Sequence, residues 1–334
     1  MPRGDDYRFV WDYRKGGATS QRADFFAAAA GKRFGFVMRA QAGILVVGSA
    51  NMDLVAFCDR LPRPGETLVG GRYATFPGGK GANQAVAAAR AGGRAAFLGR
   101  VGSDDFGARL RAGLEADGVD TRWLERVEGP SGVAVILSGG GDNMIVLTPG
   151  ANAMLDAAAP VPEAFADVKL VLCQLEIAVD AVTAVARCAH KAGAKFILDP
   201  APARELPADL LEQVDWLTPN EGEACAMLGR DRLGDPVAAA RALAALGPRG
   251  VVLKRGGDGV VLLGEDNLPV VIPAPRVAVV DTIAAGDAFA GAFAVALGEG
   301  MAPADAARFA TLAASLSVTR AGAQSAMARR DEID

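Results

Sequence analysis

Residues 281–289, DTIAAGDAF, place one carboxylate, Asp287, among residues with almost no side-chain bulk. An apolar run follows, so we expect a helix from about Gly286, entered through a turn that contains Ala284 and Ala285. The free N–H groups of a first helical turn, together with the helix dipole, favour a bound anion. This turn therefore predicts main-chain donors for a phosphate, with Asp287 placed as a base for a hydroxyl proton. From these residues alone, a helix-capping role for Asp287 is equally good.

A second glycine-rich turn, FPGGKGANQA at 76–85, also enters an expected helix. It offers the backbone amides of Gly78 and Gly79, the ammonium group of Lys80 and, one turn later, the side-chain amide of Asn83. This combination suits a polyhydroxylated ligand better than a phosphate, and its glycine spacing does not match a P-loop.

Asn51 and Asp53 leave the first expected strand, in GSANMD at 48–53. As alternate residues they would face the same side of an extended chain. Beside the GGK turn, such a pair can hold two sugar hydroxyls. For each residue alone, a turn-forming role is the commoner case.

A third set of polar residues has the form of a nucleotide site. Asn220 and Glu223 lie one turn apart where an expected strand ends and a helix begins. Facing phosphates, such a pair can hold Mg²⁺ through water, since Mg²⁺ keeps much of its hydration shell. Read alone, the pair is a helix-capping pattern. The segment LKRGGDG at 253–259 is another glycine turn that follows a strand.

The composition excludes several other kinds of site. His190 is the only histidine, which excludes a histidine-rich zinc centre, and its place at the end of an expected helix favours a solvated side chain. The 35 basic and 39 acidic residues are interspersed, with a net charge of −4, which argues against nucleic acid as a partner. The longest apolar runs are too short to span a bilayer. The four cysteines are scattered, which indicates reduced, mostly buried thiols in a cytoplasmic protein.

The elements that must position these residues alternate regularly after residue 42. Short apolar strands and helices follow one another, which predicts an α/β protein with a mostly parallel sheet covered by helices on both faces. Residues 277–280 are expected to form the strand that leads into the Asp287 turn. In such sheets, ligands bind beyond the carboxyl ends of the strands, where helices begin.

Two segments depart from this alternation. Residues 131–148 are two apolar runs around a Gly-rich turn, which predicts a hairpin. With residues 66–76 it could form a small separate sheet that acts as a lid, so we place the lid segments at about 54–76 and 127–150. Residues 1–42 lack a sustained period and are expected to be a flexible extension, in which Met38 could be the natural start.

Together these motifs resemble those of a known family. GGKGANQAVAAARAGG and DTIAAGDAF look like the two signatures of the ribokinase family of carbohydrate kinases, and NEGEA matches its N-x-x-E motif in type and chain order. The match runs from about Gly43 to the C-terminus. The resemblance implies a ribokinase-like three-layer α/β/α fold over residues 43–334, with a small β-sheet lid.

The resemblance also implies an activity, ATP-dependent phosphorylation of a sugar, with ribose and its 5-hydroxyl expected first. Asp287 would be the general base, and the turn 284–287 would form the anion hole. Ribose would be held by Asn51, Asp53, Gly78, Gly79, Lys80, Asn83 and Glu176. ATP and its Mg²⁺ would be held by Asn220, Glu223, Gly286 and the turn formed by Lys254, Arg255, Gly256, Gly257, Asp258 and Gly259, with Thr311 near the adenine.

Members of this family also bind a monovalent cation, usually K⁺, beside the anion hole. The matching positions, which act mostly through backbone carbonyls, are Asp281, Ile283, Ser317, Arg320, Gly322 and Ser325. Three positions depart from the family pattern. Ala284 stands where most members have glycine, and Thr311 stands where asparagine or histidine is frequent. Ala326 stands where the cation loop often has serine, and the adjacent Ser325 is expected to substitute for it after a small shift.

Two classes of function stay open. One is an ATP-dependent pentose kinase, whose nearest rivals are a deoxyribokinase and other sugar or nucleoside kinases of the same fold. The other is a non-catalytic sugar sensor, which would have no need of Asp287 or of the Asn220 and Glu223 pair. A lid sheet in this fold often pairs between subunits, so a homodimer is expected.

Overall fold

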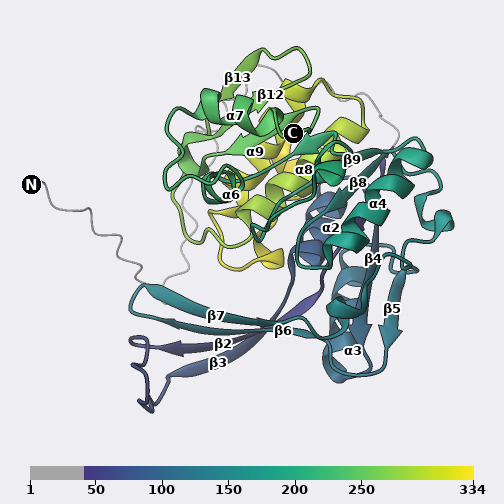
Figure 1. Ribbon diagram of the computed structural model, residues 1–334. Helices are drawn as coiled ribbons and strands as arrows, with labels where there is room; N and C mark the ends of the chain where they lie inside the picture. The colour runs from purple at the N-terminus through teal and green to yellow at the C-terminus, as the bar shows by residue number, and fades with distance from the viewer. Residues whose placement is uncertain (1–40) are drawn as a thin grey trace, which may run out of the picture.

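The computed structural model describes residues 41–334 as two sheets with surrounding helices. The expectations for a flexible extension and a start at Met38 therefore lie almost wholly outside the described residues. Figure 1 shows a large body with a smaller sheet projecting from one side of it. No helix among residues 41–334 is both long and apolar enough to cross a membrane.

The large sheet is mostly parallel. Its strands are β1 (Gly43–Val47), β4 (Arg94–Gly102), β5 (Leu124–Val127), β8 (Leu170–Cys173), β9 (Lys195–Leu198), β10 (Trp216–Leu217), β11 (Val251–Lys254), β12 (Val260–Leu263) and β13 (Pro269–Ile272). Their order is β13-β12-β11-β10-β9-β8-β1-β4-β5. Neighbours from β11 to β5 run parallel, whereas β12 is antiparallel to both β11 and β13. The parallel sheet predicted from the alternation is confirmed, with an antiparallel edge.

Helices cover both faces of this sheet because alternate strand residues point into two separate cores. In β1, Ile44 and Val46 pack into one core, whereas Leu45 and Val47 pack into the other. The first core is covered by α2 (Lys80–Arg90), α3 (Asp105–Ala116), α8 (Ala285–Gly298), α9 (Pro303–Ser317) and α10 (Arg330–Ile333). The second is covered by α4 (Val179–Lys191), α5 (Ala208–Leu211), α6 (Glu221–Met227) and α7 (Pro236–Ala244). The three-layer α/β/α prediction is confirmed.

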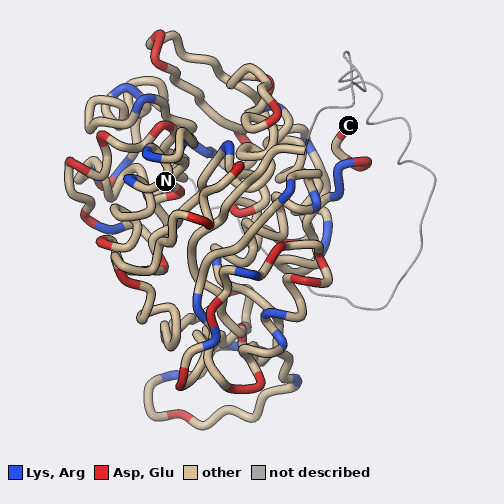
Figure 2. Tube along the Cα trace, turned by 90° about the vertical axis from the view of Figure 1, so that its right-hand side faces the viewer, with Lys and Arg blue, Asp and Glu red and all other residues tan. Residues whose placement is uncertain are grey.

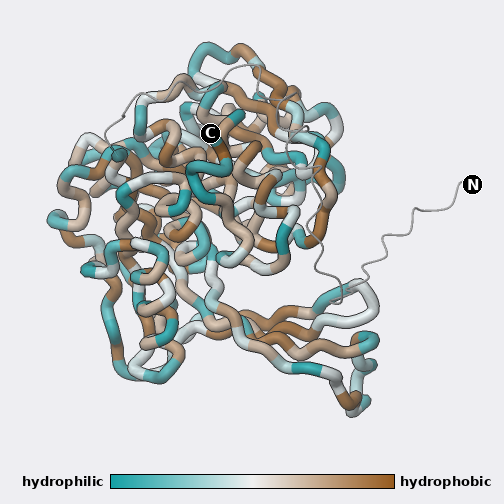
Figure 3. Tube along the Cα trace, turned by 180° about the vertical axis from the view of Figure 1, so that it is seen from behind, coloured by the Kyte–Doolittle hydropathy of each residue, from teal (hydrophilic) through white to brown (hydrophobic). Residues whose placement is uncertain are grey.

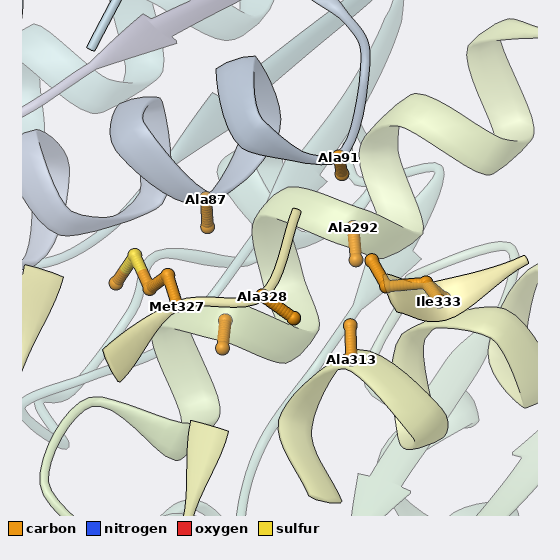
Figure 4. A pocket seen from close by; sticks show the side chains of 8 residues that line it. Ala87, Ala91, Ala292, Ala313, Met327, Ala328 and Ile333 are labelled. Atoms are coloured by element: carbon orange, nitrogen blue, oxygen red, sulfur yellow. The ribbon is translucent and has the colours of Figure 1, made fainter. Parts of the chain in front are cut away.

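Small residues let α2, α8 and α9 pack closely. A Cβ atom added at Gly291 of α8 would lie only 2.6 Å from the Cβ of Ala87 on α2. Figure 4 shows the place where alanine side chains of these helices meet Met327 and Ile333. The gap between them is lined only by apolar side chains and is too small to hold a water molecule. It is a feature of helix packing and has none of the polar groups a ligand site requires.

The small sheet consists of β2 (Asn51–Cys58), β3 (Arg72–Gly78), β6 (Gly132–Gly139) and β7 (Asp142–Thr148), in the order β3-β2-β6-β7. The antiparallel pair of β6 and β7 is the hairpin predicted for 131–148. Because β2 starts four residues after β1 ends, Asn51 and Asp53 lie where the two sheets meet. They belong to a strand, so the turn-forming interpretation of these residues is wrong. The lid role of this sheet stays a prediction.

The strand predicted at 277–280 is wrong. These residues have no strand partner, and the N–H groups of Val280 and Asp281 donate instead to the carbonyl of Val318, at 2.7 and 3.2 Å. Val279 and Val280 are also about half exposed. A run of β-branched residues favours a strand only where a sheet edge is available to pair with it. The helix α8 still begins where the sequence placed it.

Two further expectations need correction. His190 is not simply solvated, because its Nε2 lies 3.0 Å from Oδ2 of Asp215 and its side chain is only 32% exposed.

The four cysteines are free, but only Cys173 is buried. The other three lie at helix or strand positions that are partly exposed. Four short 3₁₀ helices complete the elements of residues 41–334: η1 (Gly150–Met154), η2 (Pro162–Phe165), η3 (Gly256–Asp258) and η4 (Gln324–Ala326). Figure 2 shows that the positions of Lys and Arg are interspersed with those of Asp and Glu along the chain.

Candidate active site

The candidate site forms where α2 and α8 begin. Gly79, the N-cap of α2, has φ 88°, and Ala284, the N-cap of α8, has φ 58°, so both helices start from left-handed backbone. A Cβ atom at Gly79 would lie 2.7 Å from the backbone nitrogen of Asn51, which explains why glycine is required there. The two turns bring the GGK segment and the anion-hole turn to the same edge of the large sheet.

Asp287 points towards α2 and away from its own helix end. Its Oδ2 accepts a hydrogen bond from Nδ2 of Asn83 at 3.1 Å, and its Oδ1 accepts from Nε2 of Gln84 at 3.0 Å. The helix has no side-chain cap, so the capping interpretation of Asp287 is wrong. The carboxylate is 4% exposed, and this burial raises its pKa, against the opposing effect of Lys80. Asp287 is therefore a buried, positioned carboxylate that can accept a proton.

The first turn of α8 offers backbone donors beside this carboxylate. The N–H of Ala285 lies 3.3 Å from the carbonyl of Thr282, a long contact, and the next N–H groups belong to Gly286 and Asp287. The first N–H groups of a helix have no acceptor within the helix. The geometry thus matches an anion site at residues 284–287.

The sugar-facing residues predicted from sequence lie together. A Cβ atom at Gly78 would lie 2.4 Å from Oδ2 of Asp53, so the glycine lets this carboxylate sit against the backbone. Burial, with the negative charges of Glu176 and Asp287, raises the pKa of Asp53 to about 7. Glu176 accepts from the side chain of Asn51 at 3.2 Å and from the backbone N–H of Lys80 at 3.1 Å.

Lys80 is the cation of this group. The charge of Asp287 raises the pKa of its ammonium, as do those of Asp199, Glu176 and Glu223, while burial acts in the opposite direction. Lys80 therefore stays protonated and offsets part of the surrounding negative charge.

Asn152 is a site residue that sequence reasoning missed. It is 1% exposed, and its Nδ2 donates to Oδ1 of Asn51 at 2.7 Å. Its Oδ1 accepts from the backbone N–H of Ala50 at 3.0 Å. These bonds fix which end of the Asn51 amide faces Glu176. No motif signals this role, because Asn152 lies 101 residues from Asn51 in the chain.

The nucleotide residues Asn220 and Glu223 form a full capping box at the start of α6. Both carboxylate oxygens of Glu223 accept from Asn220, from its backbone N–H at 2.7 Å and from Nδ2 at 2.8 Å. The capping interpretation is therefore correct for the protein alone. Residues 41–334 contain no group of three or more His, Cys, Asp or Glu that could hold a metal ion. This arrangement fits Mg²⁺ carried by phosphates and water, since such ions bind few protein ligands directly.

The turn that follows β11 lies beside Asn220. The backbone N–H of Lys254 donates to the carbonyl of Pro219 at 2.8 Å. In the turn itself, Arg255 pairs with Glu221 at 3.2 Å and with Asp258 at 3.1 Å. Glycines 256 and 257 are exposed, and Gly259 has φ 85°. The turn thus adjoins the Asn220 segment, and its nucleotide role stays a prediction.

Thr311 lies within α9, buried, and its hydroxyl donates to the carbonyl of Ala307 at 2.7 Å. Its polar atom is thus already bonded inside its own helix. A role for Thr311 towards adenine stays a prediction, through packing of its methyl group.

The residues predicted for a monovalent cation form two adjoining loops joined by one carboxylate. Asp281 accepts from the N–H of Ile283 and from the N–H of Gly322, both at 2.9 Å. Arg320, by contrast, turns its side chain to Glu332, and the hydroxyls of Ser317 and Ser325 donate to carbonyls of their own turns. Only main-chain carbonyls of these loops are therefore suited to a cation, with the carboxylate of Asp281 as their brace.

Known proteins resemble this chain over most of its length. Residues 41–330 match the pfkB family of carbohydrate kinases. A ribokinase of Bacillus subtilis is 42% identical over 294 residues, 87% of this chain and 98% of the relative. A deoxyribokinase of Salmonella typhi is 36% identical over 290 residues, 84% of this chain and 94% of the relative. The solved structure of Arabidopsis thaliana ribokinase complexed with ribose and ATP aligns over 88% of this chain and 98% of that one, with a TM-score of 0.81 and 34% identity.

Proposed function

Because the chain belongs to the pfkB family of carbohydrate kinases, we propose that it transfers the γ-phosphoryl group of ATP to O5 of ribose, giving ribose 5-phosphate and ADP. The observation that carries this proposal is the buried carboxylate of Asp287, held by two side-chain amides beside the free N–H groups of α8. The likeness to proteins named ribokinase supports the choice of sugar.

The transfer is a displacement at phosphorus. O5 of the sugar forms a bond to the γ-phosphorus, the bond from phosphorus to the β–γ bridging oxygen breaks, and its electron pair leaves with ADP. The proton of the 5-hydroxyl passes to Asp287. Backbone N–H donors at residues 284–287 stabilise the negative charge that develops on the phosphoryl oxygens.

Ribose is held against β2 by both hydrogen-bond donors and hydrogen-bond acceptors. Asp53 and Asn51 bind its hydroxyls, Glu176 fixes Asn51, and Lys80 with Asn83 lies between the sugar and Asp287. The buried position of Asn51 and the glycine-permitted approach of Asp53 support this assignment.

Glu223 and Asn220 would hold the water shell of Mg²⁺, which would neutralise phosphate charge when bound with ATP. This agrees with a site that has two polar side chains and, among residues 41–334, no metal cage of its own. The turn 255–259, which is exposed at Gly256, Gly257 and Asp258, covers the nucleotide, and Thr311 lies under the base. Carbonyls of Asp281, Ile283 and the 317–322 segment would hold K⁺, and the carboxylate of Asp281 joins the two segments.

A second copy of the chain covers the small sheet, which makes the protein a homodimer. Figure 3 shows hydrophobic residues along the strands of this sheet. Its exposed large apolar side chains are Tyr73, Phe76, Val135, Met144, Ile145, Val146 and Leu147. An exposed apolar surface of this extent marks an interaction site. Sedimentation velocity should give a dimer, and Ile145→Glu with Leu147→Glu should give a monomer; a monomeric unaltered protein contradicts this assignment. We place the protein in the cytoplasm, because its cysteines are free and a reducing compartment keeps thiols in that state.

The activity is tested by ADP release in a coupled assay across a panel of ribose, 2-deoxyribose, other pentoses, fructose and nucleosides. Ribose should give the highest kcat/KM, and the product should be the 5-phosphate by phosphorus NMR. A preference for 2-deoxyribose would overturn the choice of sugar and leave the kinase. Binding of ribose without turnover of any sugar would favour the sensor.

A further inference from the structure

A buried ion pair outside the predicted sugar set lies next to the anion-hole turn. At the end of β11, Nζ of Lys254 lies 2.7 Å from Oδ1 of Asp199, which follows β9. The side chains of Lys254 and Asp199 are 11% and 1% exposed. A buried pair of this kind adds little stability, because the loss of hydration offsets most of the Coulomb attraction. Its presence calls for a reason other than folding.

The ammonium group of Lys254 also abuts the start of α8. A Cβ atom built on Gly286 would lie 3.4 Å from Nζ of Lys254, with no nearer atom in between. Its positive charge opposes the rise that burial causes in the pKa of Glu223, so it also acts on the nucleotide side. Lys254 thus lies between the anion-hole turn and the capping box of α6.

This ammonium group has donors to spare. Within residues 41–334, its one hydrogen bond is to Asp199, and a lysine ammonium has three N–H donors. A buried donor without a partner is costly, which makes the two remaining N–H groups of Lys254 suited to an anionic ligand. The chemical group that fits this position is a phosphate oxygen.

Asp199 is in turn connected to the base. Nε2 of Gln84 donates to Oδ2 of Asp199 at 2.9 Å and to Oδ1 of Asp287 at 3.0 Å. Gln174 donates to Oε1 of Gln84 at 2.6 Å, which fixes the amide in this orientation. Both glutamines are fully buried. One rigid amide therefore sets the spacing between the base and the residue that anchors Lys254.

We propose that Lys254 contacts the γ-phosphoryl group during its transfer, and that Asp199 and Gln84 are positioning residues that hold this ammonium group and the base at a fixed separation. The inference rests on the proposed function and goes beyond it by assigning the cation at the transferred group. Lys254 donates two hydrogen bonds to non-bridging γ-oxygens, while the 5-hydroxyl proton goes to Asp287 and the bridging electron pair leaves with ADP.

The test uses Lys254→Met together with Asp199→Asn, because methionine alone would leave a buried carboxylate unpaired. The double variant should lose about 10²–10³-fold in kcat, the range for one lost transition-state donor. Calorimetry should show ADP bound as tightly as by the unaltered protein and ATP bound about 10- to 100-fold more weakly. Lys195→Met, the same change at an exposed lysine on β9, is the matched control and should behave like the unaltered protein.

Single variants separate the contact from a structural role. In Lys254→Ala, added ethylamine should restore part of kcat, whereas a larger amine should not. Asp199→Asn alone should lower kcat with little change in the KM for ribose. Near-normal kcat in the double variant, or equal loss of ADP and ATP binding, overturns the inference. Failure of the unaltered protein to phosphorylate any sugar would instead overturn the proposed function.

Discussion

At the scale of single residues, the site is dominated by carboxylates. Five carboxylates, those of Asp53, Glu176, Asp199, Glu223 and Asp287, surround two lysines, Lys80 and Lys254. Like charges in a partly desolvated site raise one another's pKa values. Burial is the main cause of the raised pKa values of Asp53, Glu223 and Asp287, and the neighbouring negative charges add to it. Two predictions depend on the shift of Asp53.

Replacement of Asp287 by alanine removes the proton acceptor. We expect kcat to fall about 10²–10⁴-fold, the usual contribution of a general base, while ribose and ATP still bind. Steady-state kinetics with calorimetric binding measures both. Asp231→Ala, at an exposed aspartate in the segment between α6 and α7, is the control. Near-normal turnover of Asp287→Ala would show that the base is elsewhere.

The pKa of about 7 for Asp53 predicts a pH dependence of sugar binding. Only the ionised carboxylate accepts hydrogen bonds from two hydroxyls, so the KM for ribose should rise about tenfold per pH unit below pH 7. The KM for ATP should change much less. In Asp53→Asn, the KM for ribose should be higher at pH 8 and nearly independent of pH; an unchanged pH profile would place Asp53 outside the sugar site.

The same shift has a consequence for stability. The folded pKa of Asp53 lies above the ordinary value of 3.8, so the folded state binds more protons than the unfolded state between pH 4 and 7. The contribution of Asp53 to stability therefore falls as pH rises through this range. Urea unfolding without ligand should show that Asp53→Asn gains stability relative to the unaltered protein as pH is raised from 4 to 8. A constant difference would contradict the shift.

At the scale of elements, the start of α8 contains local strain. Ala284 has φ 58°, a region that favours glycine, whereas Ala285 is the first helical residue. Ala284→Gly should raise the free energy of unfolding by about 0.5–1 kcal/mol, because it removes the steric conflict of the Cβ atom. Ala285→Gly is the matched control and should lower it by a similar amount. Urea unfolding measures both, and destabilisation by Ala284→Gly would show that the strain is absent.

At the scale of the whole molecule, the loop before α8 depends on a segment about 40 residues later. Asp281 accepts from Gly322, and Gln324 donates to Oδ1 of Asn83 at 3.1 Å, so the C-terminal loop also reaches the side chain that holds Asp287. A cation bound between these loops would therefore order the anion-hole turn without touching ATP. Its expected benefit is the pre-organisation of backbone donors.

Exchange of Na⁺ for K⁺ at constant ionic strength should accordingly raise kcat more than it lowers the KM for ribose. Asp281→Ala should flatten this response, because both of its braces, to Ile283 and Gly322, are lost. Ser325→Ala, whose hydroxyl bonds only within its own turn, tests whether that side chain takes part. Equal rates in K⁺, Na⁺ and a large organic cation would remove the cation from the proposal.

The sequence by itself determined the alternation of strands and helices, the hairpin at 131–148, and the two glycine turns with Asp287 and Lys80. These features are local, since glycine positions, apolar periodicity and helix starts depend on residues close together in the chain. The resemblance of the motifs added the family, which the match over residues 41–330 confirmed.

Only the tertiary structure decided which polar side chains meet. Gln84 contacts Asp199 and Asp287, which lie 115 and 203 residues away, and Asn152 fixes Asn51 across 101 residues. Packing of α2 against α8 turns Asp287 away from its helix end, and the Val318 carbonyl takes the N–H groups that a strand at 277–280 would have used. Such contacts follow from the packing of whole elements, and no short stretch of sequence contains the distances that govern it.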